Sequence, residues 1–146
     1  MIKVNSSIKL NMAAIKNLSD SAERALELTA EYIHTETVQD CVVPRKDGTL
    51  QGDAFFVDIS KSNAGKVTLV HNTPYARRLY FHPEYKFHKG PWEETIKHRD
   101  GTVSHLKHDG NPNAKGKWFD DWLPGGKRRD EATDVYKKIY KRLTGI

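Results

Sequence analysis

Three histidines in the middle of the chain have the residue type and close spacing of a metal-binding group. His98, His105 and His108 lie within one short polar stretch, and imidazole nitrogens bind zinc or copper. The same stretch has no cysteine, and its carboxylates lack the spacing of a catalytic metal site. We therefore interpret these histidines as solvated or interface residues, and we expect no metal and no other cofactor.

A metal-dependent nuclease of the histidine–asparagine–histidine type is the sharpest enzymatic alternative. It would use His105, His108 and Asn111, which lie in a basic part of the chain. Such a site needs a β-hairpin that leads into a helix carrying the second histidine and the cation. Pro112 and Gly116 disrupt a helix at that place. The sequence therefore predicts a protein that is not an enzyme, and the nuclease stays an alternative.

Arginine and aromatic side chains offer a different chemistry, that of a protein interface, where both are enriched. Arg77 and Arg78 are adjacent, so a helical turn points their guanidinium groups about 100° apart, toward two different surfaces. The predicted interface residues are Tyr75, Arg77, Arg78, Tyr80, Trp92, Trp118 and Trp122. A stacking platform for single-stranded nucleic acid is another use of such residues, but Asp120 and Asp121 beside the tryptophans would repel phosphates.

A long helix must support this surface. From Asn11, a good N-cap, apolar residues recur every three or four positions as far as Gln39, which predicts a helix over residues 11–39 of about 40 Å. Its apolar stripe consists of Met12, Ile15, Leu18, Ala22, Leu26 and Ile33. We expect this stripe to lie across one face of a small sheet. A short strand or arm is predicted within residues 2–10.

A β-hairpin over residues 53–71 supplies that sheet. Its strands are predicted at 54–59 and 66–71, with a loop at Lys61–Gly65. The inward face is expected to carry Phe55, Val57, Ile59, Val67 and Leu69. Pro74 then stops the second strand, because proline has no N–H to donate to a ladder. The chain thereby places the segment from Tyr75 to Tyr80 at the end of the hairpin.

The remaining residues are predicted to form an aromatic extension and a second helix. Residues 81–117 are long and polar, which is typical of functional or partner-ordered segments, and Asp100-Gly101 predicts a second hairpin within them. Trp118 and Trp122 follow at i and i+4, as a one-sided aromatic ridge. A helix is expected over 130–143. The predicted fold class is α+β in a single domain, 1–146: a small antiparallel sheet packed against the long N-terminal helix, with the extension and the C-terminal helix.

Charge is distributed unevenly along the 146 residues, whose formal net charge is +5. Residues 1–60 carry 6 basic and 9 acidic side chains, whereas residues 61–146 carry 18 and 10. The basic half makes a DNA-binding protein a second alternative, and it equally suits subunits that dock on an acidic neighbour. The single cysteine, Cys41, indicates folding inside the cell. No run reaches the ~20 apolar residues of a membrane span, so we expect no membrane contact.

Two segments carry a resemblance to a known family. They are His71-Asn-Thr-Pro-Tyr-Ala-Arg-Arg-Leu-Tyr-Phe and Asn113-Ala-Lys-Gly-Lys-Trp-Phe-Asp-Asp-Trp. Together they are similar to the minor capsid protein family encoded in head–tail gene clusters of long-tailed phages and prophages of Gram-positive bacteria. Upstream, Val43-Pro-Arg-Lys-Asp-Gly-Thr-Leu-Gln-Gly resembles a signature of the wider tail-completion (neck) protein group, although that group tends to have threonine then glycine where this chain has Gly48-Thr49.

The resemblance implies a non-enzymatic structural subunit of the virion. Such a subunit joins a ring at the head–tail neck, hexameric in the family, between connector or stopper proteins and the tail terminator or tail tube. The ring leaves a channel through which DNA passes without sequence-specific binding, and it is assembled in the host cytoplasm. Heterologous ring contacts need two different complementary patches on each subunit. The acidic helix over 11–39 and the basic half beyond residue 61 are the candidate patches.

Overall fold

The structure, a computed structural model, describes residues 11–44 and 54–145. The arm expected within residues 2–10, the first residue of the expected hairpin and most of the upstream signature segment lie outside the described residues. In chain order the elements are α1 (Met12–Gln39), β1 (Phe55–Asp58), η1 (Ser62–Ala64), β2 (Thr68–His71), α2 (Ala76–Tyr80), β3 (Trp92–Lys97), β4 (Val103–His108), η2 (Asp120–Trp122) and α3 (Arg129–Thr144). The predicted α+β class is confirmed.

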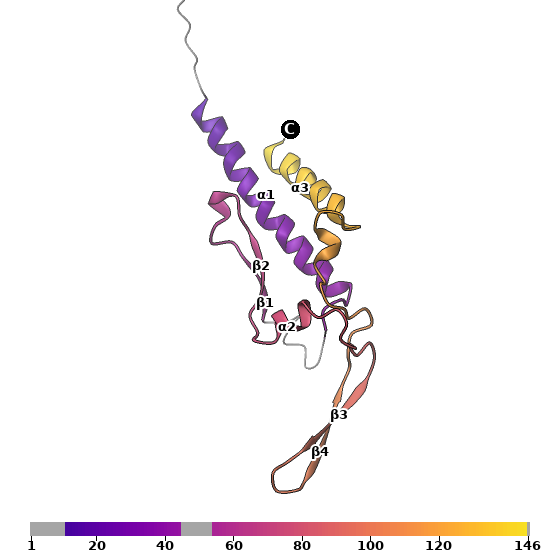
Figure 1. The fold of residues 1–146 in the computed structure, drawn as a ribbon. Coiled ribbons are helices and arrows are strands. Elements are labelled where there is room, and N and C mark those ends of the chain that lie inside the picture. The colour runs from indigo at the N-terminus through magenta and orange to yellow at the C-terminus, as the bar shows by residue number, and fades with distance from the viewer. Residues whose placement is uncertain (1–10, 45–53, 146) are drawn as a thin grey trace, which may run out of the picture.

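The long helix α1 begins and ends as predicted. The side chain of Asn11 caps it by accepting a hydrogen bond from the N–H of Ala14 at 3.0 Å. The helix lies between the β1–β2 hairpin and α3 (Figure 1). The residues it buries are small: Ser21, Ala25, Thr29, Ala30 and Thr37. Small side chains let both neighbours approach the helix closely.

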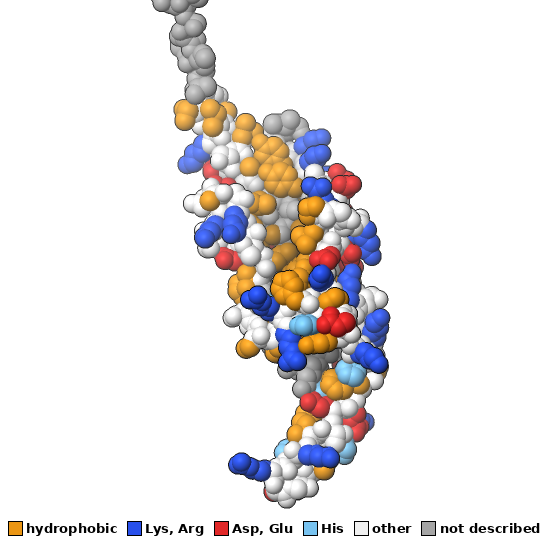
Figure 2. Space-filling view, viewed as in Figure 1, with side chains coloured by type: hydrophobic (Ala, Val, Ile, Leu, Met, Phe, Trp, Pro, Cys, Tyr) orange, Lys and Arg blue, Asp and Glu red, His pale blue; other side chains and the backbone are white. Residues whose placement is uncertain are grey.

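The predicted apolar stripe of α1 is not its buried face. Met12, Ile15 and Leu18 are 65%, 44% and 37% exposed, and Ala22 and Leu26 are half-buried. Hydrophobic side chains are accordingly visible along this helix, between the hairpin and α3 (Figure 2). The expectation that one sheet face covers the stripe is wrong, because the hairpin and α3 pack on the two flanks of α1 and leave the stripe between them.

The first hairpin pairs β1 with β2 in antiparallel register, with Phe55 opposite His71 and Asp58 opposite Thr68. Phe55 is 3% exposed and faces the body of the molecule, as predicted. The connecting loop contains η1 and ends at Gly65, whose φ of +78° favours glycine. Ile59 was expected to face inward but is exposed, because β1 ends at Asp58 and the chain has already turned toward the loop.

The core lies where two distant segments meet below α1. Val42, Val43, Ala76 and Trp118 form it, with Leu79, Tyr80 and Phe119 packed around them. Backbone N–H groups of Asn113 and Lys115 donate to the carbonyls of Cys41 and Val42 at 3.2 and 3.0 Å. The buried side chain of Asn111 adds a hydrogen bond to the Val43 carbonyl at 2.7 Å. Residues 111–118 therefore act as a strap over residues 40–43.

A second hairpin, β3–β4, extends away from this body (Figure 1). Trp92 pairs with His108 at its root and Lys97 with Val103 near its tip. The turn falls at Asp100-Gly101, as predicted, with Gly101 at φ +88° and the Asp100 carboxylate accepting from the Thr102 N–H at 2.9 Å. The two sheets of the described chain are thus separate two-stranded ladders.

The C-terminal helix α3 confirms the predicted 130–143 helix to within one residue at each end. Its apolar side, from Ala132 to Tyr140, is half-buried and packs along α1. Acidic residues occupy its first turn and basic residues its last, which complements the helix dipole. Among the described helices, none combines the length and apolarity needed to cross a membrane.

Candidate protein–protein interface

The segment after β2 is held in place from both sides. The N–H of Asn72 donates to the Ala54 carbonyl at 2.6 Å, which continues the ladder by one bond. Pro74 then ends the strand, and the chain turns into the short helix α2. Ala76 is buried in the core, whereas Arg77 and Arg78 are exposed. The turn therefore anchors one side of α2 and presents both arginines.

An aromatic cluster of His71, Phe55, Trp118 and Phe119 backs this segment. The His71 ring stacks on Phe55 with centroids 4.2 Å apart and an angle of 14° between the planes. The indole N–H of Trp118 donates to Nε2 of His71 at 3.0 Å. Because an indole N–H only donates, His71 Nε2 must be an unprotonated acceptor in this arrangement. The hydrogen bond fixes β2 and the strap in one orientation.

Tyr80 joins α2 to the same cluster. Its ring meets Trp118 edge to face with centroids 4.9 Å apart, and its hydroxyl donates to Asp120 at 3.3 Å. Burial, and next the nearby Asp120 carboxylate, raise the pKa of Tyr80 to about 12. Its backbone carbonyl accepts from the N–H of Lys117 at 2.8 Å. Tyr80 is therefore a neutral structural residue at physiological pH.

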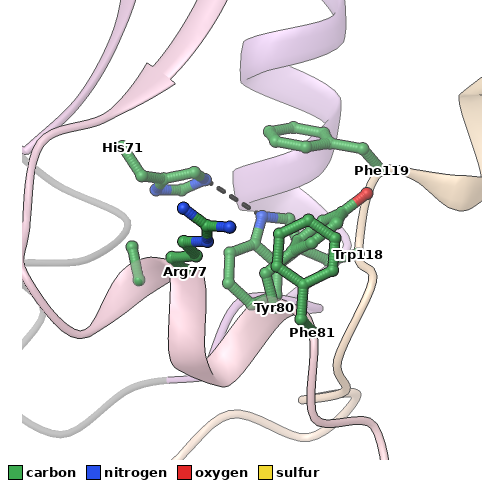
Figure 3. A pocket seen from close by; sticks show the side chains of 7 residues that line it. His71, Arg77, Tyr80, Phe81, Trp118 and Phe119 are labelled. Atoms are coloured by element: carbon green, nitrogen blue, oxygen red, sulfur yellow. Dashed lines mark hydrogen bonds between the residues drawn. The ribbon is translucent and has the colours of Figure 1, made fainter.

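An open pocket of about 270 Å³ lies on this cluster. It is lined by His71, Ala76, Arg77, Tyr80, Phe81, Trp118 and Phe119 (Figure 3). Arg77 reaches along it from α2, with its guanidinium 5.9 Å from the Phe81 ring centre. Among the described residues no carboxylate forms an ion pair with Arg77. The pocket is suited to an apolar or aromatic side chain with an acceptor beside it.

Arg78 points to a different partner, as the 100° spacing predicted. Its Nε donates to the Tyr85 hydroxyl at 3.1 Å, and the guanidinium lies 5.7 Å from the Tyr85 ring centre. This hydrogen bond raises the pKa of Arg78. Tyr75, at the start of α2, is exposed. Arg77, Arg78 and Tyr75 thus present separate contact groups around one short helix.

Trp118 and Trp122 do not form the predicted ridge. Trp118 is 1% exposed and is the largest fully buried side chain of the described chain, so it supports the pocket from below and offers no outer surface. Trp122 does not line the pocket and is half-buried against Tyr32 of α1, with ring centroids 6.3 Å apart. The ridge prediction is wrong because Lys117, at φ +47°, and a single 3-10 turn replace the expected helix. Trp92 lies apart from both, stacked on His88 at 3.9 Å at the root of β3–β4.

Arg128 is the centre of a cluster of ion pairs that the sequence did not indicate. Its guanidinium binds Glu36 at 2.7 Å, Asp40, and Glu131 at 2.6 Å, and it lies 4.2 Å from the Trp122 ring centre. The bond from Arg128, followed by one from the Tyr32 hydroxyl at 2.7 Å, lowers the pKa of Glu131 to about 2. The guanidinium joins the end of α1 to the start of α3. Its partners in α1 lie about ninety residues upstream, so no local spacing pointed to it.

The histidines do not gather into one site. His105 pairs with Glu93 at 2.8 Å and His108 with Glu94 at 3.0 Å, and their odd spacing on β4 places them on opposite faces. His98 bonds Ser104 at 2.6 Å. In the described ranges 11–44 and 54–145, no three histidine, cysteine or acidic side chains converge as metal ligands. Asn111, the third residue of the nuclease hypothesis, is buried in the strap.

Comparison of the chain with protein-family models, curated proteins and solved structures finds no match. The geometry itself shows that the two segments of the family resemblance fold together. Trp118 bonds His71, and Lys117 bonds Tyr80. Three of the seven predicted interface residues, Arg77, Tyr80 and Trp118, line the pocket at their junction.

Proposed function

We propose that this chain is a structural subunit of the head–tail neck of a long-tailed phage, which acts by assembly and catalyses no reaction. One observation carries the proposal: the two segments that resemble the minor capsid protein family meet in a single pocket. The hydrogen bond from Trp118 to His71, 3.0 Å long, joins them. A resemblance that was carried by two separate pieces of sequence thus corresponds to one surface.

The pocket supplies a contact for a neighbouring protein. Its apolar walls favour burial of an apolar side chain, and the guanidinium of Arg77 at its edge favours a carbonyl or carboxylate beside that side chain. Arg78 and Tyr75 extend the contact around α2. Interfaces of this kind derive most of their affinity from a few aromatic and arginine anchors.

The shape of the chain supports a ring subunit. The N-terminal part of α1 and the β3–β4 hairpin project from opposite ends of the body (Figure 1), and both carry exposed apolar side chains, Met12 and Ile15 on the helix and Leu106 on the hairpin. In the proposed ring, hexameric by resemblance, these ends meet other copies. The remaining surfaces meet connector or stopper proteins and the tail terminator or tail tube, around a channel for DNA.

The first test is the mass of the purified protein by light scattering, alone and mixed with the products of the neighbouring genes. DNA and magnesium are each included in a parallel sample. A discrete ring, or a complex with a neck or tail protein that leaves DNA intact, is the expected result. A monomer that ignores those proteins but cuts DNA with magnesium, or binds DNA with an affinity that falls steeply with salt, would overturn the proposal.

The double variant Arg77→Ala and Arg78→Ala tests the proposed contact at the pocket and around α2. Both side chains are exposed, so the fold should persist, while formation of the ring or of the complex with neck proteins should weaken at least tenfold. Arg142→Ala removes an exposed arginine from the far end of α3 and serves as the matched control. Assembly and infectivity equal to those of the unchanged chain would remove the pocket from the proposed interface.

A further inference from the structure

An apolar groove runs along α1 on a face separate from the pocket at α2. Its floor is Ala22 and Leu26 of α1, one wall is Ser62 and Gly65 of the first hairpin loop, and the other is Tyr136 of α3. The groove has a volume of about 330 Å³. The exposed side chains of the N-terminal part of α1 continue it (Figure 2). The groove is therefore the uncovered part of the apolar stripe.

The β3–β4 hairpin has an apolar face without a covering layer in the described chain. Residues opposite one another share a face, so Trp92, Ile96 and Leu106 lie on one face. Glu94, opposite Leu106 on that face, is held by His108 at 3.0 Å. Leu106 is 46% exposed, and no helix or other strand packs broadly on the hairpin (Figure 1). A two-stranded hairpin alone is at best marginally stable in water. Burial of this face by another molecule would stabilise it.

The charge of the surfaces involved indicates which segment of another copy can pack into the groove. Residues 12–35 of α1 carry two cations and four carboxylates, histidines aside. The hairpin as a whole is balanced, but its distal part, residues 95–107, carries three cations and one carboxylate, whereas Glu93 and Glu94 lie at its root beside His105 and His108. Packing α1 of one copy against α1 of another would bring two acidic surfaces together, which is unfavourable. The distal part of the hairpin has the opposite sign and carries Ile96 and Leu106, so it is the complementary occupant.

We infer that the β3–β4 hairpin of one copy packs into the α1 groove of the next copy. The β3–β4 hairpin projects from the end of the molecule opposite the N-terminal part of α1 (Figure 1), and it shares no residue with the groove. The contact is therefore heterologous and repeats from copy to copy, closing into a ring if the rotation permits. The inference rests on the proposed function in one respect, because it requires that the chain assembles with itself.

Two variants, studied as full-length chains, break the two sides of this contact. Leu106→Glu places a carboxylate on the apolar face of the hairpin, and Val103→Glu, an equally exposed position on the other face, is its control. Ala22→Arg fills the groove, and Ser19→Arg does so from an exposed lining position outside the core. Thr35→Arg, exposed elsewhere on α1, is the control for both. Circular dichroism confirms the fold of each.

Mixing the variants makes the test specific. Leu106→Glu alone and Ala22→Arg or Ser19→Arg alone should each lose self-assembly at least tenfold, measured by light scattering or native mass spectrometry. Mixed one to one, they should form heterodimers, because one chain still has an intact groove and the other an intact hairpin. The control variants should assemble as the unchanged chain does.

Four other outcomes overturn the inference and separate it from the proposed function. If the unchanged chain assembles and the variants do so equally well, the contact lies elsewhere and the proposed function stands. If groove variants fail while Leu106→Glu assembles, two copies of α1 pair instead. If the unchanged chain stays monomeric yet forms a complex with neck proteins, the contact between copies is refuted and the proposed function stands. If the monomer binds none of those proteins, both proposals are refuted.

Discussion

The two hairpins of this protein have the same local structure and different surroundings. Both are antiparallel pairs with glycine in the connecting turn. The β1–β2 hairpin is tied to α1 by hydrogen bonds from Ser62 to Glu27 at 2.7 Å and between His34 and the Phe55 carbonyl at 2.9 Å. The β3–β4 hairpin has no comparable support from a helix. A hairpin backed by a helix becomes part of the core, whereas one without such backing remains available for association.

Matched tryptophan substitutions give the largest expected difference between the two regions. Trp118→Ala empties the centre of the aromatic cluster and should lower the free energy of unfolding by about 3–5 kcal/mol. Trp92→Ala, at the half-buried root of β3–β4, should cost less than about 2 kcal/mol. Urea denaturation of both variants measures the difference. Equal losses would mean that the second hairpin belongs to the same cooperative core.

Removal of Arg128 should produce the next largest effect. Arg128→Ala leaves three carboxylates at the α1–α3 junction without their cation and should cost about 2–3 kcal/mol, because each remaining charge stays partly buried. Arg129→Ala, which removes an exposed neighbour, should change stability by less than about 0.5 kcal/mol. Amide exchange should accelerate in α3 and remain unchanged in β3–β4. Faster exchange in both α3 and β3–β4 would mean that the hairpin opens together with the α1–α3 junction.

Acid should destabilise the body through Glu131, with a smaller effect. Its pKa is about 2 in the folded chain, against an ordinary value of about 4.5. Its contribution to stability is therefore complete above pH 4.5 and disappears as the pH falls toward 2. Denaturant midpoints measured between pH 6 and 2 should fall less steeply for Glu131→Gln than for the unchanged chain. For Glu93→Gln, on the exposed hairpin, the denaturant midpoint should fall with pH as steeply as it does for the unchanged chain. A shallower fall for this variant would contradict the distinction between the β3–β4 hairpin and the body.

Elements defined by local sequence were predictable, and contacts between distant residues were not. The cap at Asn11 and the turn at Asp100-Gly101 depend on neighbouring residues, and both were placed correctly. The burial of Trp118 depends on His71, which lies 47 positions earlier. Likewise, nothing in the local sequence distinguishes Arg128 from the other cations. Its ion pairs exist only because the fold brings α1 and α3 together.

The candidate site was predicted in part for the same reason. The different directions of Arg77 and Arg78 follow from helical geometry and are found in α2. Phe119, which completes the pocket wall, was not predicted to take part. Periodicity also misassigned the buried face of α1, because close packing on two sides selected small residues such as Ala25 over the larger apolar ones.

The strap that crosses residues 40–43 has a consequence for biosynthesis. Its Asn113 side chain bonds the Asp40 carbonyl across 73 positions of sequence, so the body cannot close until residues 111–118 have left the ribosome. Contacts of such long sequence separation form late and slowly. A nascent chain can form α1 and the first hairpin early, but a product that terminates before residue 118 lacks both the complete aromatic cluster and the Arg128 junction. Only a chain translated beyond the strap would then present the pocket that we propose for assembly.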